Sequence, residues 1–209
     1  MWRTAAATLI LVGLAYASGA WLTMDYQIWT AEGARRLAVL RAPVAAPTVE
    51  MRGPGTQAQP LQAMLHTAGA ATIVDFIYTR CVTVCSALGG TFQHLQNALR
   101  ADRDAGRPAV QLLSISFDPA NDTPEVLAAY GQRFQASASL WHFVAPVREQ
   151  DVRTLLRRYG VVVIPDGLGG YEHNAALLVL DGDGRLVHIY DYDQADDALA
   201  LARYLAGKA

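Results

Sequence analysis

Apolar and polar positions follow two different periods along this chain, and each period predicts a kind of element. Two nearly continuous apolar runs, ATIVDFIY at 71–78 and AVQLLSISF at 109–117, are typical of buried strands. Between them, apolar residues recur at spacings of three and four from Val84 to Leu99, which predicts a helix that ends near Gly106. The same patterns predict helices over about 122–136, 149–159 and 194–205, and strands at 140–144, 175–180 and 185–190.

Cap and turn residues mark where several of these elements begin and end. The stretch 122–125 (DTPE) is typical of a helix start, with Asp122 as the cap and Pro124 in the first turn. The stretch 181–184 (DGDG) predicts a tight turn between the last two strands. This order predicts an α/β fold, with a mixed sheet and helices on both faces. Chemistry in such sheets gathers beyond the carboxyl ends of the parallel strands, where the loops with Cys81 and Asp118 begin.

The first 24 residues have the composition of a membrane-spanning helix. Residues 4–22 carry no charge, and about 20 apolar residues suffice to cross a bilayer. Trp2 and Trp21 flank this run and Arg3 precedes it, which favours an N-terminus on the inside. A cleaved signal peptide is the alternative, because AYA at 15–17 and SGA at 18–20 resemble cleavage sites. We favour the uncleaved anchor, since the run is long for a signal peptide, and expect a single-pass protein of the inner membrane with its domain on the periplasmic side.

Composition divides the chain into three regions: an anchor or signal segment at 1–24, a tether with a candidate edge strand at 25–60, and a folded domain at 61–209. Six proline or glycine residues lie between Arg41 and Pro60, which disfavours a long helix there, and TVEM at 48–51 is the candidate strand. A length of 209 residues accommodates one domain with a sizeable core plus an attached segment.

The charge of the chain argues against nucleic acid as a partner. Charged residues make up 17% of the chain and the net charge is -2. The densest basic spot is brief, Arg35-Arg36 with Arg41. Binding to phosphates needs a concentrated basic face, which this chain lacks.

The only two cysteines, Cys81 and Cys85, lie where the first buried strand passes into a helix. Positions i and i+4 are neighbours on a helix, so both sulfurs can face one spot. A helix N-terminus also lowers a thiol pKa and so favours the thiolate. A plain disulfide, a redox couple and two metal ligands are all open interpretations. A disulfide across so short a loop stabilises the fold little, and a zinc site of four thiolates would need two more cysteines.

A metal interpretation needs a third ligand, and the five histidines are the candidates. His173 stands out because it lies in GGYEHNAAL, where a glycine-rich loop becomes a strand. His94 falls off the apolar stripe of its helix and His188 alternates on a hairpin strand, so we expect both to face solvent. His142 stands between two aromatic residues and is expected to pack, and His66 has no partner suggested by the sequence.

Three stretches occur in an order that resembles the Sco/SenC family of copper-binding proteins. They are FIYTRCVTVCS at 76–86, FDPANDTPEVLAAY at 117–130 and YEHNAALLVLDGDGRLV at 171–187. The resemblance covers roughly residues 48–206 and includes the N-terminal anchor. It implies a thioredoxin-like fold that binds one copper ion through Cys81, Cys85 and His173.

The resemblance further implies a membrane-tethered copper metallochaperone that helps to assemble the CuA centre of cytochrome c oxidase. Its partner is then subunit II of that oxidase or its own copper donor, and its cargo is Cu(I), with Cu(II) as a further candidate. Two thiolates and one imidazole form a soft ligand set that suits Cu(I), whereas zinc normally takes a fourth ligand or water.

Two other functions stay open at this point. An exported thiol–disulfide oxidoreductase would use Cys81 and Cys85 to reduce partner cysteines, with Pro165 as a thioredoxin-type proline. The chaperone and reductase roles can coexist, because both use the same thiolates. A disulfide-stapled binding module without redox or metal chemistry is the third interpretation.

Some residues depart from the family's pattern. Family members commonly carry proline after each cysteine and aspartate before the histidine, where this chain has Val82, Ser86 and Glu172. None of these changes removes a ligand. Asp118 is interpreted either as a residue at the rim of the metal site or as a carboxylate that caps its loop.

Overall fold

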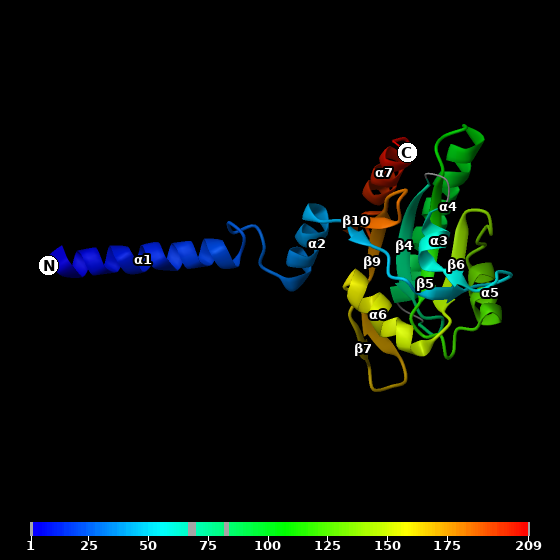
Figure 1. The fold of residues 1–209 in the computed structure, drawn as a ribbon, viewed down its shortest axis with the longest axis horizontal. Coiled ribbons are helices and arrows are strands. Elements are labelled where there is room, and N and C mark those ends of the chain that lie inside the picture. The colour runs from blue at the N-terminus through cyan, green and yellow to red at the C-terminus, as the bar shows by residue number, and fades with distance from the viewer. Residues whose placement is uncertain (1, 67–69, 82–83, 209) are drawn as a thin grey trace. The chain divides into compact units, whose positions relative to one another are not determined.

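The structure is a computed structural model that describes residues 2–66, 70–81 and 84–208, with the side chains of 84–86 excluded. The chain forms two compact units, Met1–Arg41 and Ala42–Ala209 (Figure 1).

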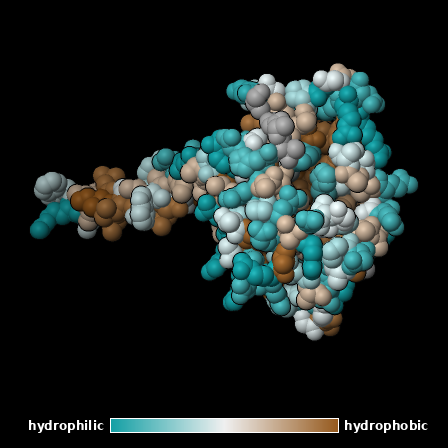
Figure 2. All heavy atoms as spheres, turned by 45° about the vertical axis from the view of Figure 1, so that its right-hand side comes forward, coloured by the Kyte–Doolittle hydropathy of each residue, from teal (hydrophilic) through white to brown (hydrophobic). Residues whose placement is uncertain are grey.

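The first unit contains two helices, α1 (Trp2–Leu22) and α2 (Ala31–Arg41). None of the residues of α1 is buried, and the helix is long and apolar enough to be a candidate membrane span. Figure 2 shows apolar residues crowded along α1, whereas the visible face of the second unit is mostly hydrophilic. We disfavoured a long helix at 41–60, and α2 forms before that stretch, in a part of the tether where we had predicted no element. Ion pairs from Glu32 to Arg35 and Arg36, at 2.6 and 2.9 Å, stabilise its first turns.

The second unit is built on an eight-stranded sheet with the order β1-β10-β9-β4-β5-β6-β2-β3. A separate two-stranded sheet contains β7 and β8. The strands are β1 (Val44–Ala45), β2 (Glu50–Arg52), β3 (Gln59–Pro60), β4 (Ala71–Ile77), β5 (Val110–Ser116), β6 (Trp141–Pro146), β7 (Val163–Pro165), β8 (Tyr171–His173), β9 (Ala176–Leu180) and β10 (Arg185–Asp191).

The sheet is mixed, as predicted, because β4, β5 and β6 are parallel while β9 runs antiparallel to β4. All seven residues of β4 are buried, which explains its continuous apolar pattern. The register pairs Ile77 with Ser116, so β4 and β5 end side by side at one edge of the sheet. The candidate edge strand is β2, which pairs with both β6 and β3, so that β3 is the edge.

Five helices accompany the sheet: α3 (Leu61–Leu65), α4 (Val84–Asp104), α5 (Pro124–Arg133), α6 (Glu149–Tyr159) and α7 (Ala195–Ala206). The main core joins α4, α5 and α7 to one face of the sheet through residues such as Phe92, Leu127 and Ala202. On the opposite face, Tyr159 of α6 contacts Phe76 of β4 with ring centroids 5.9 Å apart. Helices therefore cover both faces, as the order of elements predicted.

The start of α5 differs in one detail from the prediction. Thr123, not Asp122, is the cap, and its side chain accepts a hydrogen bond from the Val126 amide at 3.4 Å. The Asp122 carboxylate instead accepts hydrogen bonds from Thr79, in the loop after β4, and from Ser116, the last residue of β5. Asp122 and Thr123 are both residue types that cap helices, so the sequence alone could not tell which of them caps α5.

A carboxyl group lies in the middle of the central strand. Asp75 is 1% exposed, between Ile73 and Ile77 on the face that α4 covers, and its Oδ1 has no hydrogen-bond partner among the described residues. Burial raises the pKa of Asp75 to about 7, although a hydrogen bond with Ser114 lowers it in part. Ser114 in turn accepts a hydrogen bond from the Trp141 indole at 2.8 Å. Asp75 is therefore protonated in the folded state at acidic pH.

The Asp75→Asn variant should lose a pH dependence of stability that the wild type shows. The folded-state pKa lies above the unfolded value, so wild-type stability falls as pH rises from about 4 to about 7 and the penalty is complete above that range. We expect the variant to be more stable than wild type at pH 8 and similar at pH 4, measured by urea unfolding of residues 42–209. Asp104→Asn, at an exposed carboxylate, is the control and should keep the wild-type slope. Equal slopes in all three proteins would contradict the prediction.

Candidate metal centre

Cys81 lies in a tight turn directly after β4. Its side chain is 5% exposed, and its amide donates to the Tyr78 carbonyl at 3.2 Å. Helix α4 begins three residues later at Val84, so Cys85 belongs to its first turn, as predicted. The Cys85 side chain and the whole of Val82 lie outside the described residues. The structure therefore tests the position of Cys81 and the backbone of Cys85, but not the distance between the sulfurs.

Asp122 fastens the entry to this turn. Its carboxylate is almost fully buried and accepts hydrogen bonds from the Thr79 amide at 3.1 Å and from the Thr79 and Ser116 hydroxyls. Burial raises the pKa of Asp122, while these hydrogen bonds pull it down in part. One carboxylate thus joins the loop after β4 to the end of β5.

Asp118 adds a second link between the same two loops. Its carboxylate accepts from the Arg80 guanidinium at 2.9 Å and from the Asn121 amide at 2.8 Å. The side chain of Asp118 is only 6% exposed, whereas that of Arg80 is half exposed. These contacts agree with the interpretation of Asp118 as a carboxylate that caps its loop.

The glycine-rich loop before His173 forms the tip of the β7–β8 hairpin. Asp166 closes this loop, because its Oδ1 accepts from the amides of Leu168 at 2.7 Å and Gly170 at 2.9 Å. Gly167 and Gly169 adopt positive φ angles of 76° and 90°, which favour glycine. The hairpin then pairs His173 with Val163, the first residue of β7. We did not predict these two short strands.

His173 lies among aromatic rings at the edge of the sheet where β4 and β5 end. Its ring centroid is 5.3 Å from that of Phe117, which follows β5, and 6.5 Å from that of Tyr78, which follows β4. Burial lowers the pKa of His173, so the imidazole is neutral at pH 7, which is the form that binds metal. The fold therefore brings His173 to the same edge as the Cys81 turn, although 92 residues separate them in sequence.

The other histidines lie elsewhere. His94 is exposed and lies 3.2 Å from Asp196, as its position off the apolar stripe predicted. His188 is half-buried, contrary to our expectation of a solvent-facing ring, and stacks on Tyr190 at 4.1 Å. Among the described side chains, which do not include that of Cys85, no three His, Cys, Asp or Glu residues form a metal cluster.

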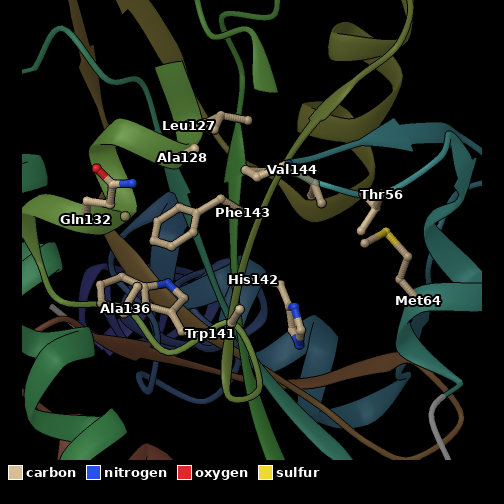
Figure 3. Close-up of a pocket in the computed structure, with 13 residues that line it drawn as sticks. Thr56, Met64, Leu127, Ala128, Gln132, Ala136, Trp141, His142, Phe143 and Val144 are labelled. Atoms are coloured by element: carbon tan, nitrogen blue, oxygen red, sulfur yellow. The ribbon is translucent and has the colours of Figure 1, made fainter. Parts of the chain in front are cut away.

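His142 lines a pocket of about 360 Å³ beside β6 and α5, which contains none of the predicted ligands. Figure 3 shows its ring on the opposite side of β6 from Trp141 and Phe143. Burial lowers the pKa of His142, in agreement with the packing role that we expected.

A cleft of about 560 Å³ adjoins the aromatic rings around His173. Phe117 and Tyr171 form part of its wall, the first turns of α6 form another part, and Pro165 lines it from the end of β7. In Figure 1 the β7 hairpin accordingly lies beside α6 at one end of the domain. Solvent therefore reaches the immediate neighbourhood of the half-buried His173.

A thioredoxin-like sheet with a cysteine pair at a strand–helix junction, and a half-buried histidine on a hairpin at the same edge, defines a class of thiol- and imidazole-bearing domains. Residues 58–205 match the SCO1/SenC family, and this chain belongs to that family.

Individual relatives support the same assignment. The SCO1 protein homolog of Bacillus subtilis (strain 168) is 26% identical over 125 residues, which span 59% of this chain and 63% of that protein's length. The crystal structure of a SCO1/SenC family lipoprotein from Bacillus anthracis strain Ames matches with a TM-score of 0.69 and 24% identity, over 80% of this chain and 99% of that one. These structural likenesses establish the thioredoxin-like fold.

Two further solved structures carry descriptions that bear on function. ScoI from Bradyrhizobium japonicum, solved with copper bound, has a TM-score of 0.62 and 23% identity, over 77% of this chain and 99% of that one. BsSco, a member of the Sco family of cytochrome c oxidase assembly proteins with a disulfide switch, has a TM-score of 0.67 and 19% identity, over 80% of this chain and 96% of that one.

Sequence reasoning missed the roles of Tyr78, Thr79 and Asp122 in this edge. Tyr78 is buried and its ring contacts those of Phe117, Tyr171 and His173. Thr79 and Asp122 are 43 residues apart, and no local pattern relates them. The only available signal was their position directly after predicted parallel strands, which place polar residues at a common edge.

The Asp122→Ala variant should lower the free energy of unfolding by about 1–3 kcal/mol, because it removes the acceptor for buried donors of Thr79 and Ser116. Urea unfolding of residues 42–209 should show a lower midpoint with an unchanged slope. Asp104→Ala, which removes an exposed carboxylate, provides the matched control. A midpoint equal to that of the control would show that Asp122 does not stabilise the loop.

Proposed function

We propose that this chain is a membrane-tethered copper metallochaperone that binds one copper ion through Cys81, Cys85 and His173 and assists assembly of the CuA site of cytochrome c oxidase. The ion is Cu(I), with Cu(II) as a further cargo. The partner is subunit II of the oxidase or the donor from which this protein receives its copper.

The position of the half-buried His173 ring beside the ends of β4 and β5 is the observation that carries this proposal. Its imidazole lies next to Phe117 and Tyr78, and the neutral form that desolvation favours there is the form that binds a metal. Cys81 follows Tyr78 by three residues, and the first turn of α4 carries Cys85.

The donor atoms fit copper better than other common metals. Thiolate sulfur is a soft ligand that selects Cu(I), and imidazole also suits copper. Zinc would normally take a fourth ligand or a water molecule. Three ligands from a turn, the start of a helix and a hairpin, next to an open cleft, also suit an ion that must be released to another protein.

The relatives bear on cargo and partner. ScoI of Bradyrhizobium japonicum binds copper in its crystal structure, and BsSco belongs to a family of cytochrome c oxidase assembly proteins. Membership of the SCO1/SenC family makes the same cargo and the same process the best-supported choice for this chain.

The His173→Ala variant should bind copper much more weakly than wild type. Reduced protein without residues 1–24 should bind about one equivalent of Cu(I), and the variant should lose affinity by about 100-fold or more, since even residues behind the ligands contribute 10–100-fold. Competition with a chromophoric Cu(I) chelator measures both quantities. His94→Ala, which replaces an exposed histidine on α4, is the matched control and should bind as wild type does.

Equal affinity of the His173→Ala and wild-type proteins would remove His173 from the ligand set. The alternative function, an exported thiol–disulfide oxidoreductase, would then be the better-supported one. The disulfide switch of BsSco is consistent with that alternative. That activity needs Cys81 and Cys85 but not the imidazole. Reduction of a disulfide substrate should therefore survive in His173→Ala and disappear in Cys81→Ser.

We also propose that residues 1–24 anchor the protein in the inner membrane, that residues 25–60 tether the domain, and that residues 61–209 form the copper-binding domain on the periplasmic side. The exposed apolar surface of α1, with Trp2 and Trp21 near its ends, supports the anchor. Arg3 before the helix and Asp25 after it support the orientation.

Alkaline carbonate extraction tests the anchor. The full chain should stay with the membrane pellet, whereas protein without residues 1–24 should enter the supernatant, because a spanning helix is held by its apolar length rather than by charge. The mass of the mature N-terminus distinguishes an anchor from a cleaved signal peptide. A mature protein that begins after residue 17 or 20 would disprove the anchor.

A further inference from the structure

The Tyr78 hydroxyl joins two segments that lie 93 residues apart in sequence. It donates a hydrogen bond to the Tyr171 carbonyl at 3.1 Å and accepts one from the Tyr171 amide at 3.1 Å. Both backbone groups of one residue in β8 are thus bound by one buried hydroxyl at the end of β4. His173 lies two residues further along β8.

The hairpin needs such an anchor. Strands β7 and β8 have three residues each and form no ladder with the main sheet, and an isolated two-stranded hairpin is marginally stable at best. Asn174 fastens the base of the hairpin, since its Oδ1 accepts from the Val162 amide at 2.8 Å. Tyr78 fastens the strand that carries His173 to the segment that carries Cys81.

Aromatic rings around Tyr78 pack the segment after β4 against strand β8. Tyr78 lies 5.3 Å from Phe117 and 5.3 Å from Tyr171, and the second pair meets edge to face at 89°. A side chain at Gly170 has no room, because its first carbon would lie 3.1 Å from the Tyr78 hydroxyl and 2.5 Å from Asp166 Oδ2. The Tyr78 hydroxyl is therefore packed closely against the hairpin backbone.

We propose that Tyr78 is a positioning residue for copper binding: its hydroxyl holds the β8 backbone so that the His173 imidazole meets the Cys81 turn. This inference rests on the proposed function, because the hydrogen bonds between Tyr78 and Tyr171 can serve copper binding only if His173 is a ligand. Tyr78 does not itself touch the metal. It sets where one ligand lies relative to the others, which lowers the reorganisation needed when the ion arrives.

Tyr78→Phe isolates this role, because it keeps the ring contacts and removes only the hydroxyl. The full chain in detergent should bind Cu(I) about tenfold more weakly when it carries Tyr78→Phe, in the range found for residues that orient metal ligands. In the His173→Ala background the same change should not lower the Cu(I) affinity further, since the Tyr78 hydroxyl acts through the position of the imidazole. Tyr204→Phe, at an exposed tyrosine of α7, is the matched control.

A second measurement needs no copper. Amide hydrogen exchange of peptides from 163–173 should become faster in Tyr78→Phe, while peptides from α7 should exchange as in wild type and so report an intact fold. A purely structural change elsewhere would not confine the effect to the hairpin.

Three outcomes would overturn the inference, and they are distinguishable. Wild-type affinity in Tyr78→Phe beside weak binding in His173→Ala would refute the role of Tyr78 and leave the ligand set intact. A loss that persists in the double variant would show that Tyr78 acts by another route. Wild-type affinity in His173→Ala would refute the proposed ligand set and, with it, the purpose assigned to Tyr78.

Discussion

The parallel pairing of β4 with β5 is the constraint on which the candidate metal centre depends. Both strands are almost wholly buried, and their register ends with Ile77 opposite Ser116. Because a slip by one residue would move every side chain of a strand, Asp75 and Ser114 included, to the opposite face of the sheet, this register is firmly fixed. The two following loops must therefore start side by side, and their polar residues meet there. Asp122 binds Thr79 and Asp118 binds Arg80, and these two contacts hold the loops together.

The second requirement is that a distant segment reach the same edge. Asn174 at the base of the β7–β8 hairpin binds the Val162 amide and so joins its two strands, while Tyr78 near the tip joins the hairpin to the edge where β4 ends. Neither contact belongs to a sheet ladder. The position of His173 therefore depends on side-chain contacts of its hairpin rather than on the register of the main sheet.

The departures from the family's pattern acquire a physical meaning in this setting. Where relatives commonly place proline after the first cysteine, this chain has Val82. The entry to the turn is instead held by hydrogen bonds of Thr79 to Asp122 and by the ion pair of Arg80 with Asp118. Buried hydrogen bonds to a carboxylate restrict the backbone by a different route from a fixed φ angle.

The sequence by itself determined the elements with strong local patterns: the buried strands, the long helices, the DGDG turn and the position of the cysteine pair at a strand–helix junction. It also singled out His173, from its loop and from the family resemblance. Only the tertiary structure decided that Tyr78 is buried, that Asp122 serves a neighbouring loop rather than its own helix, and that His173 lies beside Phe117. The reason is physical. Periodicity and caps are set by residues within a turn or two of each other. These contacts instead join segments 43 to 93 residues apart, whose meeting depends on the packing of the whole sheet.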